Sequence, residues 1–316
     1  MLLILTNSTD ATSDYLERRL AASSINFARV NTDCCSTTFR VHIRAGRAAL
    51  KTERRSIFSD EVANVWFRRP GPIDCPVSQD PAETKHVRDE WSEALEGFFA
   101  QIAVEAWVNH PARNVMASHK IEQLARASRM GLATPETIVT QSPEEARQFF
   151  YECREEVIVK PLASGYIERN DGSDTVLYTH AILASDLSKI SSIAKCPTLL
   201  QRKIRKQRDI RVTVMDDDIH AVSLSAKEIG EQQRLDIRRD NMRDVQYKLT
   251  EIPNDVRQNI FRYHKSYGLR FSAIDMAIDR DGKWIFFEIN PNGQWAWTDL
   301  AGVTDIGASF IKAFQK

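Results

Sequence analysis

Two apolar segments near the C-terminus carry acidic residues inside them. Phe271–Ile278 and Trp284–Ile289 are separated by an Asp-Arg-Asp-Gly stretch, a composition typical of a hairpin turn. Side chains alternate between the faces of a strand, so Glu288 and Asn290 project together, and antiparallel pairing can place Asp275 beside them. The sequence therefore predicts an antiparallel sheet with a cluster of oxygen ligands on one face.

This cluster has the chemistry of a magnesium site. Two carboxylates and an amide oxygen, without thiol or imidazole, suit Mg²⁺ rather than zinc. The alternative is a solvated strand face followed by an Asn-Pro turn. The metal site is favoured because Asp275 and Glu288 lie in otherwise apolar strands, where an unpaired charge is unfavourable.

Charge and composition exclude several classes of protein. The 316 residues contain 43 Lys and Arg and 43 Asp and Glu, so the formal net charge is zero. A general polyanion binder carries a basic surplus, so we expect no nucleic-acid partner. The apolar N-terminus lacks a basic region and is too short for a signal or a membrane span, so we expect no membrane partner.

The cysteines indicate a reducing compartment. None of the five forms a CxxC pair or lies near a His cluster with zinc spacing, and a scattered odd set is typical of ordinary thiols. We therefore expect a cytoplasmic protein. The cysteines are Cys34, Cys35, Cys75, Cys153 and Cys196.

The length suggests two or three subdomains, and we divide the chain at 1–112, 113–196 and 197–316. The first part alternates strand and helix signals, with a hairpin over 39–52 and one long amphipathic helix from Pro81 to Val108, broken by Asn109-His110-Pro111. The second begins with a helix over 116–129 and contains strands at 137–140 and 156–160. The third has strands at 198–202, 209–215 and 219–225, a helix over 254–267 and the final hairpin.

Three further features are weak when each is taken alone. Lys160 ends an apolar strand before a Ser/Gly-containing loop whose N–H groups could lie over phosphates. Lys120 would pass as a surface helix residue. The segment Thr198–Ile204 could offer alternating backbone donors and acceptors to a flat base, although an edge strand is the simpler interpretation.

The order of these features resembles the ATP-grasp superfamily, and more narrowly the graspetide synthetases, the ligases that cyclise ribosomal peptides such as the microviridins. The resemblance covers nearly the whole chain. Its most specific part is Glu288–Trp295, because Glu-Ile-Asn-Pro-Asn-Gly occurs across ATP-grasp enzymes and the following Gln-Trp points to this branch. The other matching segments are Val65–Pro70, which contains a Trp-Phe-Arg-Arg-Pro motif, and Trp107–Asn109 followed by Lys120, Leu124, Ala127, Gly131, Pro135 and Thr137.

The resemblance implies an α/β ATP-grasp fold with an N-terminal pre-ATP-grasp domain, a central subdomain and a C-terminal antiparallel-sheet subdomain. It also implies ATP and Mg²⁺ as cofactors. The residues that it assigns are Lys120 and Lys160 for the nucleotide phosphates, Gln201, Lys203 and Ile204 for adenine, Asp209 for ribose or peptide, Arg211 and Arg238 for the γ-phosphate and acyl-phosphate, and Asp275, Glu288 and Asn290 for magnesium.

Two positions depart from the family pattern. Several other ATP-grasp ligases have an arginine two residues before the first magnesium-binding Asp, where this chain has Ala273. The role of that arginine then falls to Arg211 and Arg238. In addition, Ile237 stands where tryptophan is common in this branch.

The function that follows is ATP-dependent macrocyclisation of a precursor peptide with leader and core segments, in which Asp or Glu is joined to Thr, Ser or Lys. One alternative is a glutamate-ligase type enzyme that joins free amino acids to a protein tail or to small molecules. Another is a non-catalytic nucleotide-binding protein, which the intact set of lysines, carboxylates and Asn290 disfavours. The family also implies a homodimer.

Overall fold

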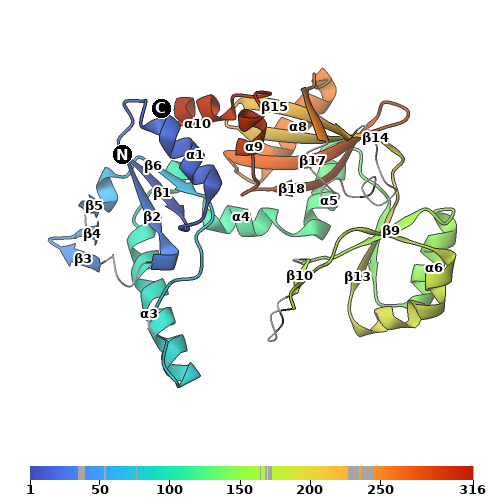
Figure 1. The fold of residues 1–316 in the computed structure, drawn as a ribbon, viewed down its shortest axis with the longest axis horizontal. Coiled ribbons are helices and arrows are strands. Elements are labelled where there is room, and N and C mark those ends of the chain that lie inside the picture. The colour runs from blue at the N-terminus through green and yellow to red at the C-terminus, as the bar shows by residue number, and fades with distance from the viewer. Residues whose placement is uncertain are drawn as a thin grey trace.

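The computed structural model describes residues 1–34, 40–52, 55–75, 77–163, 165–167, 169, 173–226, 235 and 245–315. Three groups of elements follow one another along the chain (Figure 1). The N-terminal group and the C-terminal sheet lie side by side, and the middle group lies beyond the long strand β14 (Lys206–Met215). The expected arrangement of an N-terminal α/β part, a central part and a C-terminal antiparallel sheet is present.

The N-terminal group is built on a parallel sheet of order β2-β1-β6-β7. Its strands are β1 (Leu2–Thr6), β2 (Phe27–Asn31), β6 (Asn64–Phe67) and β7 (Trp107–Val108). All five residues of β1 are buried, as expected for a parallel strand covered on both faces. Helix α1 (Ala11–Leu20) is capped by the Asp10 carboxylate. A second, antiparallel sheet contains β3 (Arg40–Arg44), β4 (Arg47–Lys51) and β5 (Ser56–Phe58), and its β3–β4 hairpin confirms the predicted one.

The prediction of one helix from Pro81 to Val108 is wrong. Helix α3 ends at Phe99 and is followed by a 3₁₀ turn (Val104–Ala106) and strand β7. The apolar residues beyond Phe99 do not continue the helical stripe. Instead, Trp107 and Val108 extend the parallel sheet beside β6 and are buried there. Tertiary pairing therefore overrides the local periodicity.

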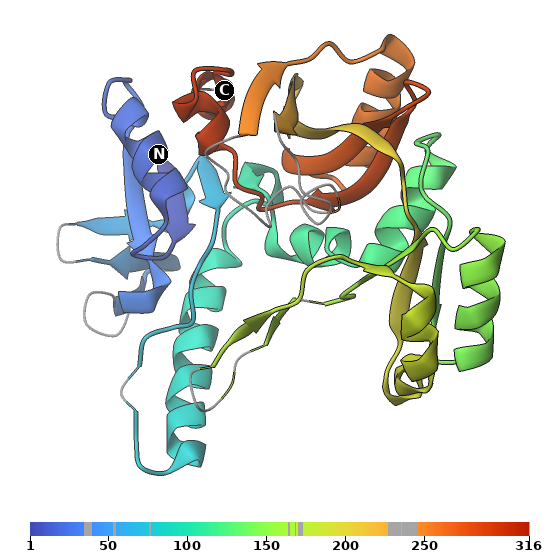
Figure 2. The ribbon, with the colours of Figure 1, turned by 45° about the vertical axis from the view of Figure 1, so that its right-hand side comes forward.

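The middle group contains an antiparallel sheet of order β12-β9-β13-β8. The predicted helix over 116–129 is two helices, α4 (Pro111–Ala117) and α5 (Lys120–Arg129), because Ser118 and His119 interrupt it, and both pack on the C-terminal sheet. The other elements are β8 (Thr137–Thr140), α6 (Pro143–Glu152), β9 (Val157–Lys160), β12 (His180–Ile182), a 3₁₀ segment (Ala184–Lys195) and β13 (Thr198–Arg202). A small hairpin of β10 (Tyr166–Ile167) and β11 (Thr175–Val176) projects from this group (Figure 2).

The C-terminal group is a five-stranded antiparallel sheet of order β16-β15-β14-β17-β18. Besides β14, its strands are β15 (Asp218–Ala226), β16 (Val245–Leu249), β17 (Phe271–Asp279) and β18 (Trp284–Asn290). The hairpin of β17 and β18 confirms the prediction. One face packs on α8 (Asn254–Ser266), and the chain ends with α9 (Ala296–Leu300) and α10 (Ile306–Phe314).

The N-terminal group is docked on the C-terminal group through the two most distinctive motifs. Arg68 of Trp-Phe-Arg-Arg-Pro is 1% exposed and lies 3.4 Å from the equally buried Asp10 carboxylate. It donates to the Asn292 carbonyl and, at 2.6 Å, to Gln294 Oε1. Burial lowers the pKa of Arg68 to about 10. Because Asn292 and Gln294 belong to the loop after β18, the two motifs form one buried contact.

Aromatic rings surround this contact. Trp66 and Trp295 have ring centroids 6.5 Å apart, and Trp295 stacks on Phe310 at 4.8 Å. The Asn109 side chain adds hydrogen bonds to the backbones of Arg270, Phe271 and Pro291. The N-terminal sheet, β17 and α10 therefore share one core.

His264 in α8 gives the fold a pH-dependent stability. The side chain is 1% exposed, its Nδ1 lies 2.8 Å from Ser272 Oγ, and its Nε2 has no partner in the described part of the chain. Burial lowers the pKa of His264 from 6.5 to about 4. The neutral form is therefore favoured in the folded state, and its stabilising effect is complete above pH 6.5 and is lost as the pH falls towards 4.

We expect the free energy of unfolding to decrease by about 3 kcal/mol more in the wild type than in His264→Gln between pH 7 and pH 4. Urea unfolding of both proteins at several pH values would measure this difference. Parallel pH profiles would contradict the assignment to His264.

No helix in the described residues has both the length and the apolar character that a membrane crossing requires. The expected thiols Cys34, Cys75, Cys153 and Cys196 are free, whereas Cys35 lies outside the described residues.

Candidate active site

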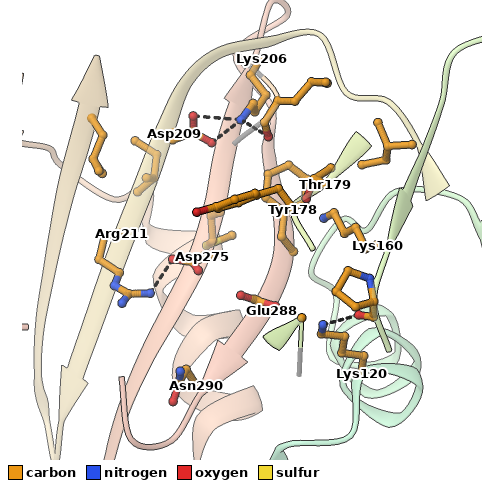
Figure 3. A pocket seen from close by; sticks show the side chains of 18 of the residues that line it. Lys120, Lys160, Tyr178, Thr179, Lys206, Asp209, Arg211, Asp275, Glu288 and Asn290 are labelled. Carbon is orange, nitrogen blue, oxygen red and sulfur yellow. Dashed lines mark hydrogen bonds and ion pairs between the residues drawn. The ribbon is translucent and has the colours of Figure 1, made fainter. Parts of the chain in front are cut away.

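A cavity of about 930 Å³ lies between the middle group and the C-terminal sheet. Its walls come from the start of α5, from β9 and the β10–β11 hairpin, and from strands β14, β17 and β18 (Figure 3). Of the predicted site residues, those that line it are Lys120, Lys160, Lys203, Ile204, Asp209, Arg211, Asp275, Glu288 and Asn290.

The predicted acidic residues form a row with Arg211 across three strands. Arg211 of β14 is the register partner of Asp275 in β17, and Asp275 is the partner of Glu288 in β18. Arg211 Nη1 lies 2.5 Å from Asp275 Oδ1, and its Nη2 donates to the Gln294 carbonyl at 3.2 Å. The structure thus confirms the expected neighbourhood of Asp275, Glu288 and Asn290, all of which face the cavity (Figure 3).

A bulge in β18 turns Glu288 towards the cavity. Asp275 pairs with Glu288, whereas the next residue, Met276, pairs with Phe286, so Phe287 is an extra residue. Under strict alternation Glu288 would share the face of Phe286, which is fully buried in the core. The bulge instead places both Phe287 and Glu288 on the cavity wall.

The two predicted lysines lie close to the same turn of chain. Lys120 Nζ donates to the Pro161 carbonyl at 2.6 Å. Lys160, the residue before Pro161, lies 4.9 Å from the Phe287 ring centroid in a cation–π contact and donates to Gln201 Oε1 at 3.0 Å. Both ammonium groups point into the cavity opposite Glu288 (Figure 3).

Lys203 and Ile204 occupy the connection between β13 and β14. Lys203 N–H is bonded to the Glu156 carbonyl at 2.8 Å, and the Ile204 carbonyl accepts from Lys206 N–H at 3.0 Å. Apolar side chains of Ile158, Leu224 and Met276 also line the cavity. Such walls suit the faces of a flat ring.

Gln201 lies behind the cavity wall. Its side chain is 2% exposed, its Oε1 accepts from Lys160, and its Nε2 donates to Thr137 Oγ1 at 2.9 Å. Thr137 therefore fixes the amide with its oxygen towards the lysine. The described contacts of the Gln201 amide are therefore with Lys160 and Thr137, and Gln201 is not among the residues that line the cavity, so its contact with adenine stays a prediction.

We expect Gln201→Leu to raise the KM for ATP about tenfold, because a hydrogen bond to a charged group contributes about 1.5–3 kcal/mol. Thr137→Val should have a smaller effect in the same direction, and the double variant should equal Gln201→Leu because the two act in one chain of contacts. Steady-state kinetics of the three variants would test this. An unchanged KM in Gln201→Leu would contradict the positioning role.

Asp209 is paired with Lys206, which was not among the predicted site residues. Lys206 Nζ lies 2.7 and 2.9 Å from the two Asp209 carboxylate oxygens (Figure 3). Tyr178 and Thr179, beyond β11, also line the cavity, as does Arg69 from the N-terminal group. Of these three residues, Arg69 alone belongs to a motif that the sequence analysis singled out, Trp-Phe-Arg-Arg-Pro. Arg238, the second predicted arginine, lies outside the described residues.

The donor set fits a hard divalent cation. Asp275, Glu288 and Asn290 present two carboxylates and an amide from adjacent strands, while the described residues contain no group of three or more His, Cys, Asp or Glu that could hold a metal. Such an incomplete oxygen set is typical of magnesium sites, in which waters and substrate phosphates complete the coordination. The facing lysines provide the charge that those phosphates would need.

Comparisons with known proteins agree with this geometry. Residues 1–114 match the family described as the MvdD pre-ATP grasp domain. The fold is similar to a RiPP-associated ATP-grasp ligase of Chryseobacterium gregarium, solved with ADP and a leader and core peptide, with a TM-score of 0.87, 26% identity and coverage of 98% of this chain and 94% of that one. No curated protein matches the sequence.

Two other solved structures show how far the similarity of the fold extends. The macrocyclase MdnC of Microcystis aeruginosa, solved with its precursor peptide MdnA, has a TM-score of 0.85 and 24% identity, with 98% of this chain and 97% of that chain covered. D-alanyl-alanine synthetase A of Vibrio cholerae has a TM-score of 0.59 and 12% identity, with 99% and 97% covered.

The fold is therefore that of the ATP-grasp ligases. Within this class the N-terminal domain indicates the branch, because residues 1–114 match the MvdD type of pre-ATP-grasp domain. Over nearly its whole length the chain is thus similar to RiPP-associated ATP-grasp ligases and macrocyclases, and its first 114 residues match the microviridin-type N-terminal domain.

Proposed function

We propose that this protein uses ATP to form ester or amide rings between side chains of a ribosomal precursor peptide with leader and core segments. One observation carries the proposal: the row of Arg211, Asp275 and Glu288 faces Lys120 and Lys160 across a single cavity. The peptide complexes of the Chryseobacterium and Microcystis relatives support the choice of substrate.

The residues suit activation of a carboxylate, in which a side-chain carboxylate oxygen of the peptide would attack the γ-phosphorus of ATP, ADP would leave and an acyl-phosphate would form. Lys120 and Lys160 would hold the nucleotide phosphates, and Lys203 and Ile204 would contact the base through the backbone. Arg211, fixed by Asp275 and the Gln294 carbonyl, would neutralise the charge on the transferred phosphoryl group. Magnesium held by Asp275, Glu288 and Asn290 would supply Lewis-acid stabilisation of phosphoryl transfer.

The second half of the reaction needs an enclosed acyl-phosphate. A side-chain hydroxyl or amine of the same peptide would attack its acyl carbon, and phosphate would leave. The cavity wall formed by Tyr178, Phe287 and the β10–β11 hairpin would limit access of water to this intermediate. Each ring would thus form with loss of one water from the peptide.

The glutamate-ligase type of activity is the second candidate. It would use the same phosphoryl-transfer residues but a free amino acid as acceptor, and the MvdD type of N-terminal domain disfavours it.

Incubation with ATP, Mg²⁺ and short precursor-like peptides encoded near this gene should give peptide products lighter by one water per ring. Phosphate release with a panel of amino acids, in the absence of any peptide, would instead support the ligase of free amino acids.

Three further features belong to this proposal. The chain would act as a homodimer in the cytoplasm, with functional parts at 1–112, 113–196 and 197–316. The division is supported by the three separate groups of strands. Sedimentation analysis at micromolar concentration would test the dimer, and a monomer would reject it.

A further inference from the structure

The outer edge of β18 is held by groups from α5 and the segment after it. β18 is an edge strand of its sheet, and α5 lies along that edge (Figure 1). Phe286 N–H donates to the Ala133 carbonyl at 2.8 Å. Three residues later, the backbone of Ile289 is bonded to the side chain of Gln123. The bulged residues Phe287 and Glu288 lie between these two attachments.

Gln123 binds both polar groups of one β18 residue. Ile289 N–H donates to Gln123 Oε1 at 3.1 Å, and Gln123 Nε2 donates to the Ile289 carbonyl at 3.0 Å. The amide thus takes the place of a neighbouring strand at this one residue. Ile289 separates Glu288 from Asn290, so both proposed metal ligands are adjacent to the contact.

The amide of Gln123 is itself fixed. Its Nε2 also donates to the Ala117 carbonyl at 2.7 Å, the side chain is 3% exposed, and Tyr263 Oη donates to the Gln123 carbonyl at 3.3 Å. A buried amide whose oxygen and nitrogen are all bonded to backbone groups holds those groups in place, because movement would leave polar groups unpaired.

The same helix reaches the opposite wall of the cavity. Lys120, one turn before Gln123, donates to the Pro161 carbonyl beside Lys160. Helix α5 therefore joins the phosphate-facing lysines to the strand that carries Glu288 and Asn290. The spacing between the two sets of charges depends on the Gln123–Ile289 contact.

We infer that Gln123 is a positioning residue that sets the place of Glu288 and Asn290 for a divalent cation bound with the nucleotide. This inference rests on the proposed metal site. Groups that orient metal ligands typically change metal affinity about 10- to 100-fold when they are removed.

The test measures Mn²⁺ binding to the full-length enzyme with ADP, by electron paramagnetic resonance of free Mn²⁺. Gln123→Met keeps the size of the side chain and removes both hydrogen bonds to Ile289, and we expect its Mn²⁺ Kd to rise about tenfold. Leu124→Ala is the matched control on α5, since Leu124 packs on the core but holds no β18 backbone group. It should lower the melting temperature and leave the Kd within about twofold.

A Gln123→Met protein that melts earlier but binds Mn²⁺ as the wild type does would overturn the inference. If Gln123→Met fails to fold, Gln123→Glu decides, because it keeps the acceptor for Ile289 N–H and loses the donor. A weakening in Gln123→Glu supports the inference, and an unchanged Kd overturns it. Wild-type enzyme that binds no Mn²⁺ with ADP would refute the metal site itself, which is a separate result.

Discussion

Glu288→Gln is expected to abolish ring formation while the protein stays folded. The carboxylate faces the cavity beside Asp275, and the neutral amide has almost the same shape, so the main change is the loss of one negative charge at the metal site. Metal stabilisation of a phosphoryl-transfer transition state amounts to several kcal/mol, and about 4 kcal/mol corresponds to a fall in kcat of about a thousandfold.

Mass spectrometry of the precursor peptide would measure this loss as the rate at which water is eliminated. Asp281→Asn is the matched control, because Asp281 is an exposed carboxylate in the turn between the same two strands. Its rate should equal that of the wild type. Ring formation by Glu288→Gln at the wild-type rate would remove Glu288 from the site.

The sequence was most informative where local pattern and pairing agree. Strand periodicity and the turn composition predicted the β17–β18 hairpin and the neighbourhood of Asp275 and Glu288. The family resemblance predicted that Lys120 and Lys160 line the same site. Acidic residues inside apolar strands are a strong signal, because a charge at such a place needs a partner. Here the row across the sheet supplies Arg211.

The features that the sequence did not reveal depend on long-range contacts. The bulge at Phe287 has no local mark, yet strict alternation would turn Glu288 into the core. The segment after Phe99 has helical periodicity but becomes strand β7, since β6 offers it an open edge. The side chain of Gln201 was predicted to contact adenine, but its described hydrogen bonds are with Thr137 and Lys160, which no local pattern indicates.

The motifs with the clearest family resemblance also have a structural role that their sequences do not indicate. Arg68 and Gln294 are 226 positions apart and meet in a buried contact between the N-terminal domain and the loop after β18. The backbone carbonyl of the same Gln294 accepts from Arg211. Docking of the N-terminal domain is therefore connected to the position of the proposed phosphate-binding arginine.

Arg211→Lys is expected to lower kcat about 100-fold, although it keeps the positive charge. The guanidinium contacts Asp275 with one nitrogen and the Gln294 carbonyl with another, and its Nε has no partner in the described part of the chain. A lysine ammonium is a single compact group and cannot keep both contacts while it reaches a phosphoryl oxygen. Loss of one oriented donor to a transition-state charge costs about 3 kcal/mol.

Arg208→Lys provides the comparison for Arg211→Lys, because Arg208 lies on the same strand but lines a separate hollow. Its guanidinium donates to the neighbouring Gln207 side chain. The kcat of Arg208→Lys should stay within about twofold of the wild type.

The KM for ATP should change little in Arg211→Lys, since an interaction made mainly in the transition state affects kcat. A large rise in KM with unchanged kcat would instead assign Arg211 to ground-state binding of the nucleotide, because uniform binding affects KM alone.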